Sequence, residues 1–165
     1  KMATPTQKSV TKVGRTLDDT DREILRILQE DGRISSVDLA FKVKLSPVSV
    51  GARLKRLQND GVVVGFTARL NAKQLELGFL AFVRVNLKAM NKRGFGAFAN
   101  AVRKAPEILE CYMLMSGCYL LEVRVKDTES YREFIDRVVC KLPNVREVHS
   151  QIVMEETKPF GPLPI

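Results

Sequence analysis

The stretch from position 45 to 57, LSPVSVGARLKRL, contains the residues best suited to contact another molecule. Ser46 is a favourable helix N-cap, and Pro47 fits the first helical position, where its missing N–H costs no hydrogen bond. Three apolar residues then recur at helical spacing: Val50, Leu54 and Leu57. The stretch therefore predicts an amphipathic helix with one buried face.

The opposite face of this predicted helix is basic and carries small side chains. Arginine can bond guanine bidentately in the major groove, and cations on the same face can neutralise phosphates. We expect Ser49 and Arg53 to face bases, and Lys55 and Arg56 to face the backbone or base edges. The candidate DNA-contacting residues are Ser46, Val48, Ser49, Ala52, Arg53, Lys55 and Arg56. An ordinary amphipathic surface helix is the alternative that this stretch alone leaves open.

The charge distribution favours an anionic partner for the N-terminal half. The 165 residues carry a net charge of +8. Positions 1–70 hold 13 basic and 8 acidic residues, whereas positions 71–165 hold 14 and 11. An excess of positive charge around the predicted basic helix is typical of a surface that meets DNA phosphates.

Cysteine and histidine are too few and too scattered to predict a metal or catalytic centre. The three cysteines, Cys111, Cys118 and Cys140, are an odd number without C-x-x-C spacing, which disfavours a disulfide framework and a structural zinc site. His149 is the single histidine. We therefore predict no metal, no cofactor and no catalytic residues, and classify the chain as a non-enzyme.

The sequence also lacks the signals of a membrane protein. No uninterrupted apolar run approaches the roughly 20 residues of a membrane-spanning helix, and no signal-peptide pattern opens the chain. We expect a cytoplasmic, nucleoid-associated protein without a membrane partner. Residues 1–16 contain four basic residues and no acid, and are predicted to form a disordered basic tail.

Two further helices are expected before the basic one. The first begins after Leu17, because acids crowd its first turn and apolar residues recur at helical spacing, with Asp21 outward. The second, short helix is expected near positions 34–43. Three short helices with a tight connection between the last two are typical of a helix-turn-helix, which we assign to residues 17–61.

The remainder of the chain predicts β structure and a second domain. The β-rich segment 62–77 is expected to be an arm and linker, with a strand over Val62–Leu70 that forms either a wing or the arm. Residues 78–158 alternate strands and helices in the order β-α-β-β-α-β, and 159–165 form a C-terminal tail. The expected elements are strand 79–87, helix 95–102, strand 108–115, strand 119–125, helix 128–140 and strand 145–154. The predicted fold class is α+β: a winged-helix-like helix-turn-helix, a β-strand arm and a ferredoxin-like βαββαβ sandwich.

In this order and spacing, the motifs resemble the Lrp/AsnC family, the feast/famine transcription regulators of bacteria and archaea. The match covers roughly residues 17–158. The motifs that carry it are LDDTDREIL at 17–25, DGRIS at 31–35, LSP at 45–47, RLKRL at 53–57, GVV at 61–63, ECY at 110–112, LPNV at 142–145 and VMEETK at 153–158.

The resemblance implies a regulator that binds double-stranded DNA and forms dimers through its ferredoxin-like domains, often assembling further into tetramers or octamers. Apolar residues on one sheet face, such as Leu80 and Phe82, give a physical reason for assembly. The resemblance also implies a site for an amino acid or another small effector near the turn between the central strands. The corresponding effector-binding residues are Ser116, Gly117, Cys118, Tyr119 and Ser150.

The sequence departs from the family at this turn. The family usually has G-D-x-D-Y-L-L, whereas residues 115–121 read MSGCYLL, without either acid. A carboxylate is the natural partner of an α-ammonium group, so an amino acid, another metabolite and assembly without an effector all stay open. Two other functions are alternatives: an architectural, nucleoid-type DNA binder with little sequence preference and, more remotely, an enzyme resembling tetrapyrrole decarboxylases.

Overall fold

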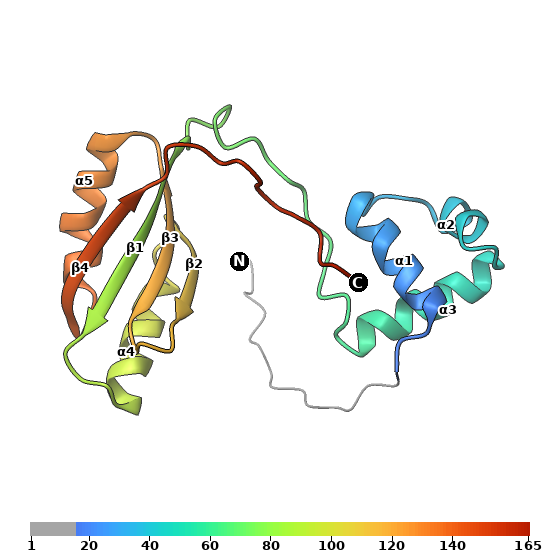
Figure 1. The fold of residues 1–165 in the computed structure, drawn as a ribbon, viewed down its shortest axis with the longest axis horizontal. Coiled ribbons are helices and arrows are strands. Elements are labelled where there is room, and N and C mark those ends of the chain that lie inside the picture. The colour runs from blue at the N-terminus through green and yellow to red at the C-terminus, as the bar shows by residue number, and fades with distance from the viewer. Residues whose placement is uncertain (1–15) are drawn as a thin grey trace. The chain divides into compact units, whose positions relative to one another are not determined.

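The computed structural model describes residues 16–165, which divide into two compact units (Figure 1). The first unit comprises the described residues through Arg69 together with the segment Lys158–Ile165. The second unit comprises Leu70–Thr157. The basic tail expected over residues 1–16 lies outside the described residues, except for its last position.

Three capped helices form the first unit: α1 (Asp19–Glu30), α2 (Ser36–Lys42) and α3 (Pro47–Asn59). Each begins after a cap residue whose side chain accepts a hydrogen bond from the backbone N–H three residues later; these caps are Asp18, Ser35 and Ser46. In α1 the Asp21 carboxylate also accepts the Asp18 N–H, which completes a capping box. The predicted order of three short helices is confirmed.

The helices of the first unit enclose a small apolar core. It is formed by residues from all three helices: Ile24, Leu25, Leu39, Ala40, Val50 and Leu57. Asp21 lies on the same side of α1 and is 0% exposed, so the expectation that it faces outward is wrong. It precedes Leu25 by four residues and therefore shares the inward stripe of α1. A carboxylate can occupy this position because arginines of α3 neutralise it.

The segment after α3 does not form the strand that its β-rich composition predicts. In the described chain, residues 62–77 contain only turns, bends and irregular backbone, so the expected wing or β arm is absent. The N–H groups of Val62 and Val63 both donate to the carbonyl of Leu57 and so end α3, while Val64 is 93% exposed. A strand needs a neighbour that takes its backbone hydrogen bonds, and the described chain places none beside this segment.

The second unit has the predicted ferredoxin-like order. Its elements are β1 (Phe79–Leu87), α4 (Lys92–Val102), β2 (Ile108–Met113), β3 (Tyr119–Val125), α5 (Thr128–Arg137), the 3-10 turn η1 (Val139–Lys141) and β4 (Val145–Ile152). The sheet order is β2-β3-β1-β4, with every neighbouring pair antiparallel. The ends differ slightly from the prediction, since α5 ends at Arg137 and β2 ends at Met113.

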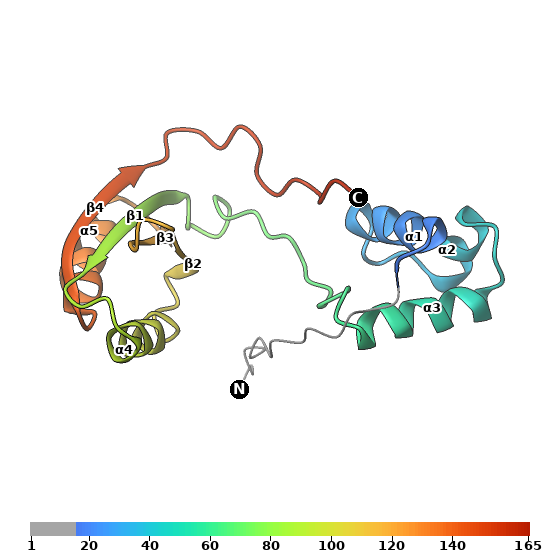
Figure 2. The same cartoon turned by 60° about the horizontal axis from the view of Figure 1, so that its bottom comes forward.

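Helices α4 and α5 pack against one face of this sheet (Figure 2). Alternate residues of β1 and β3 face them and form the core with Phe98 of α4 and Phe134 of α5. In the unit Leu70–Thr157 no helix covers the other face, which we call the open sheet face. Its residues on the two central strands are Leu80, Phe82 and Arg84 of β1 and Leu120, Glu122 and Arg124 of β3.

Candidate functional site

Helix α3 has the two faces that its sequence predicts. Val50 and Leu57 are buried in the core, whereas Val48 is 83% exposed at the N-terminal end of the helix. Ala52 and Lys55 are also exposed and follow Val48 at spacing i, i+4 and i+7, so the three share one side of the helix. We call Val48, Ala52 and Lys55 the exposed row of α3.

Ser46 and Ser49 lie together in the first turn of α3. Their hydroxyl oxygens are 2.8 Å apart, and the Ser49 N–H donates to Ser46 Oγ at 3.1 Å. Both residues are exposed. Since a hydroxyl can donate and accept at once, this pair can still offer a donor to an anion at the helix N-terminus.

The arginines of α3 have a different environment from the exposed row. Arg53 Nη1 donates to Asp18 Oδ2 at 2.6 Å and to Asp21 Oδ1 at 2.8 Å. Arg56 Nη2 donates to the second oxygen of Asp21 at 2.5 Å. We call these four residues the aspartate–arginine clamp, because they join the N-terminal turn of α1 to the middle of α3.

At the centre of the clamp, two arginines compensate the charge of Asp21. Asp21 is fully buried, and each of its carboxylate oxygens accepts from a different guanidinium. Hydrogen bonding by Arg53 lowers the pKa of Asp18, and the bonds to Asp18 and Asp21 raise the pKa of Arg53. With 29% and 31% of their side chains exposed, Arg53 and Arg56 keep part of their surface free.

Sequence reasoning placed Arg53 and Arg56 on the DNA side and missed the clamp. The available signal was a pair of acids three residues apart in α1 and a pair of arginines three residues apart in α3. Each pair lies on one face of its helix, so the two can meet if the helices pack. Base contact by Arg53 and Arg56 therefore stays a prediction. Their hydrogen bonds to Asp18 and Asp21 are a second role for the same guanidinium groups.

The turn between β2 and β3 forms as the sequence predicts. The Gly117 N–H donates to the Leu114 carbonyl at 2.9 Å, and Gly117 has the positive φ of +79° that glycine adopts readily. The methyl carbon of Met90 lies 2.2 Å from the position that a Cβ at Gly117 would take, so a side chain there would require the end of this flexible, exposed side chain to move. Cys118 is buried, and its Sγ is 3.1 Å from the Ser116 hydroxyl.

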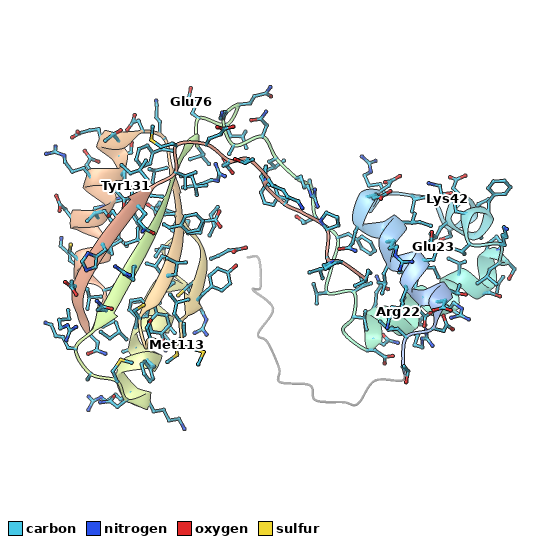
Figure 3. All side chains as sticks on the ribbon, viewed as in Figure 1. Arg22, Glu23, Lys42, Glu76, Met113 and Tyr131 are labelled. Atoms are coloured by element: carbon cyan, nitrogen blue, oxygen red, sulfur yellow. The ribbon has the colours of Figure 1, made fainter. Side chains whose placement is uncertain are left out.

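The predicted effector residues do not gather at one place. Tyr119 packs its ring on Phe98 of α4, with centroids 4.6 Å apart, and is itself buried. Ser150 lies on β4, where its hydroxyl oxygen accepts a 2.6 Å hydrogen bond from the hydroxyl of Tyr131, which is labelled on α5 in Figure 3. Strand β1 separates β3 from β4. The turn residues Ser116–Tyr119 are therefore grouped together, and Ser150 is apart from them.

The open sheet face carries charges that the sequence did not single out. Glu110 of β2 is paired in register with Glu122 of β3, so two acids stand on adjacent strands. Burial, together with Glu110, raises the pKa of Glu122. Arg124, only 9% exposed, donates to Glu156 Oε2 at 2.5 Å. Alternation along β2 and β3 is the signal that would have placed these charges on one face.

The described residues offer little else that could do chemistry. Over residues 16–165, no three His, Cys, Asp or Glu side chains gather as a metal site would require, and no helix is long and apolar enough to cross a membrane. Desolvation raises the pKa of the Cys111 thiol to about 11, which disfavours a reactive thiolate. His149 is paired with Glu147 at 3.1 Å on the edge strand β4.

Both units match known protein families. Residues 17–58 match the AsnC-type helix-turn-helix domain, and residues 80–163 match the Lrp/AsnC ligand binding domain. The leucine-responsive regulatory proteins of Klebsiella pneumoniae and Escherichia coli (strain K12) are each 40% identical to this chain over 146 residues, which is 88% of this chain and 89% of theirs.

Solved structures agree with this assignment. A transcriptional regulator of Neisseria meningitidis, solved as an L-Met complex, superimposes with a TM-score of 0.85 at 37% identity, covering 90% of this chain and 97% of that one. An AsnC family transcriptional regulator from Agrobacterium tumefaciens gives a TM-score of 0.84 at 34% identity, with the same coverage.

A helix-turn-helix domain followed by a ferredoxin-like ligand-binding domain defines a DNA-binding transcriptional regulator. The chain belongs to the Lrp/AsnC family of these regulators.

Proposed function

We propose that the exposed row of α3 and the Ser46–Ser49 turn meet DNA, while the clamp holds α3 in place. The observation that carries this proposal is the contrast along one helix: Lys55 is exposed, whereas Arg53 and Arg56 are bonded to carboxylates of α1. The small Ala52 allows the helix backbone to approach the groove, and Val48 offers methyl groups for thymine. Arg53 and Arg56 then act mainly as positioning residues that also contribute positive charge.

Two substitutions of equal charge test this surface. DNA fragments bound by the wild-type protein are first selected from a random pool, and Kd is measured on the best fragment at fixed salt. Ala52→Glu places an acid in the exposed row, and Gln58→Glu places one outside the row on the same helix. We expect Ala52→Glu to weaken binding at least tenfold and Gln58→Glu less than threefold. Equal losses would show that this row does not face DNA.

We propose sequence-specific regulation rather than architectural packaging of DNA. The support is the uneven chemistry of the α3 surface, which mixes apolar, hydroxyl and cationic groups instead of presenting lysines alone. Specific regulators bind their sites at least about 10³-fold more tightly than random DNA at the same salt. A ratio near one between the selected fragment and random DNA would favour the architectural alternative.

We propose an amino acid or a related small metabolite as the effector of the second unit. Support comes from the match of residues 80–163 to a ligand binding domain and from the Neisseria meningitidis relative, solved with L-methionine. The turn at Ser116–Tyr119 lacks the family's acids, so an α-ammonium group would need another partner. Fragment binding and assembly are measured with and without L-methionine, L-leucine and the other amino acids. No response to any of them would remove amino acid sensing from the proposal.

We also propose that the protein acts as a dimer or a higher oligomer on the nucleoid, without catalysis. On the open sheet face, the partly exposed Phe82 and Leu120 support association of two second units, whereas Leu80 is only 7% exposed and contributes little. The placement of His149 on an edge strand, paired with one carboxylate, offers no cluster of acid–base groups. Light scattering across concentrations measures the assembly, and a monomer at micromolar concentration would contradict it.

A further inference from the structure

The segment Lys158–Ile165 belongs to the first unit although it follows the second unit in the sequence. Gln29 of α1 holds it by a reciprocal pair of hydrogen bonds. The Leu163 N–H donates to Gln29 Oε1 at 2.6 Å, and Gln29 Nε2 donates to the Leu163 carbonyl at 3.2 Å. The Gln29 side chain thus accepts from and donates to the backbone of Leu163. These are the two hydrogen bonds that a residue of a neighbouring strand would make.

Further contacts on both sides of this pair hold the segment. Arg26 Nε donates to the carbonyl of Ile165 at 2.6 Å, and the Ile165 side chain packs against the apolar core of the helices. Upstream, the Arg69 guanidinium lies 5.7 Å from the centre of the Phe160 ring. The segment therefore makes polar, apolar and cation–π contacts, all within the first unit.

The chain just before this segment is anchored to the second unit. The Val153 N–H donates to the Leu80 carbonyl at 3.0 Å and extends the pairing of β4 beyond its last residue. Three residues later, Glu156 accepts from Arg124, a nearly buried guanidinium on the open sheet face. Only Thr157 to Pro159 separate this anchor from the contacts at Phe160.

Helix α1 joins the docked segment to the DNA-contacting helix. Arg26 and Gln29 hold the segment at the C-terminal half of α1, and Glu23 pairs with Arg26 at 3.0 Å. At the N-terminal end of the same helix, Asp18 and Asp21 accept hydrogen bonds from Arg53 and Arg56 of α3. A shift of α1 is therefore transmitted to α3 through the clamp.

We propose that Arg26 and Gln29 form a docking surface for residues 160–165 of this chain, and that docking couples the second unit to DNA binding. The segment has two states in this proposal: docked on α1 and released from it. A ligand or a partner subunit that breaks the Arg124–Glu156 pair frees the chain just before the segment and so changes how readily residues 160–165 stay docked. The inference rests on the proposed role of α3 in DNA binding.

The polar contacts of the docked segment contribute little net free energy. The hydrogen bonds to Gln29 and Arg26 are exposed, so water competes for the same groups. Docking also orders several residues of backbone, which opposes it entropically. A small change at the anchor can therefore release the segment, and a small gain can fix it.

Two pairs of variants of the full chain test the proposal. Leu163→Pro removes the N–H that Gln29 accepts, and Leu163→Ala is its control because it keeps that N–H; Leu163 is 72% exposed, so neither change disturbs a core. Gln29→Ala removes the other side of the pair, and Glu30→Ala is the control at the neighbouring exposed position. Hydrogen exchange over α1 and residues 160–165 reports docking, and Kd for the selected DNA fragment reports coupling.

We expect Gln29→Ala to speed exchange of the Leu163 N–H, and both Gln29→Ala and Leu163→Pro to shift Kd at least fivefold in the same direction, the lower end of allosteric effects. The two controls should stay within twofold of wild type. Unchanged exchange would overturn docking, and faster exchange with an unchanged Kd would overturn coupling. If the wild-type protein binds no DNA fragment, the proposed function fails and the coupling with it, whereas the exchange data still decide whether the segment docks.

Discussion

Each unit contains an acidic side chain that is at least partly buried, and the charges around these two acids differ. In the first unit Asp21 is fully buried, and a guanidinium of α3 meets each of its carboxylate oxygens. In the second unit Glu122 is partly buried and stands in register with another acid, Glu110, while neighbouring Arg124 donates to Glu156. Asp21 joins α1 to α3 through ion pairs, whereas Glu122 stands beside a like charge on the open sheet face. A unit that must hold a fixed helix needs the first arrangement, whereas an association surface tolerates the second.

The largest expected effect follows from breaking the clamp at its centre. Asp21→Ala leaves two guanidiniums without their shared carboxylate, and removal of one member of a buried ion pair costs about 3–5 kcal/mol. Because the arginines are about one-third exposed and can be hydrated, we expect a loss of unfolding free energy near the lower end, about 3 kcal/mol.

Urea unfolding of the helical signal measures this loss. The control is Asp19→Ala, an exposed acid in the same first turn of α1, for which we expect a change of roughly 0.5 kcal/mol or less. If the two variants lose the same free energy, the clamp contributes nothing beyond the ordinary helix-dipole effect.

The next effect separates positioning from base contact by Arg53. Hydrogen bonds to charged groups contribute about 1.5–3 kcal/mol, so Arg53→Ala should cost about 1.5 kcal/mol of stability given its partial exposure. A double-mutant cycle with Asp21→Asn shows how Arg53 acts on DNA. If Arg53 works through α1, its removal changes Kd much less in the Asp21→Asn background than in the wild type. An undiminished loss of affinity in that background would assign Arg53 to the DNA itself.

A smaller effect is expected from the exposed row. Lys55 is exposed, so Lys55→Ala should leave stability within about 0.5 kcal/mol of wild type. Loss of one phosphate contact should reduce the slope of log K against log salt by about 1. The measurement is Kd at several salt concentrations, with Lys42→Ala on α2 as the matched control. An unchanged slope for Lys55→Ala would place this residue away from the phosphates.

The sequence predicts most of the fold because local signals agree with one another. Caps such as Ser46, periodic apolar residues and the Gly117 turn each act within a few residues, and the elements form close to their predicted positions. The strand over Val62–Leu70 fails because strand formation depends on a partner that composition cannot supply. The burial of Asp21 was missed because it depends on two residues more than 30 positions away.

The site is less predictable than the fold for the same reason. The exposed row follows from helical spacing alone, so Val48, Ala52 and Lys55 were placed correctly on the outer side of α3. The docking of residues 160–165 on α1 has no local signature, since the bonds to Gln29 use the Leu163 backbone and their partner lies 134 positions away in the sequence. Ser150 was grouped with the turn by resemblance, and sheet order sets it apart.

The smallest expected effect is a difference in pH response between the units. The pKa of Asp18 is lowered in the folded protein, so its contribution is present above the unfolded pKa and is lost as pH falls through the folded value. The pKa of Glu122 is raised, so its contribution is present below the unfolded pKa and is lost as pH rises through the folded value. Acid therefore removes the contribution of Asp18 in the first unit and relieves the strain at Glu122 in the second.

Glu122→Gln isolates the second of these responses. The variant removes the repulsion from Glu110, and we expect its thermal midpoint to exceed that of wild type by about 1–2 °C at pH 7, because solvent screens a charge that is only partly buried. As pH falls through the raised pKa of Glu122, the wild-type carboxyl takes up a proton and the difference should shrink. Glu133→Gln on the exposed side of α5 is the control and should show no such pH-dependent gain. A destabilised Glu122→Gln at pH 7 would mean that the carboxylate is bound by a partner on the open sheet face, and the two buried acids would then be alike.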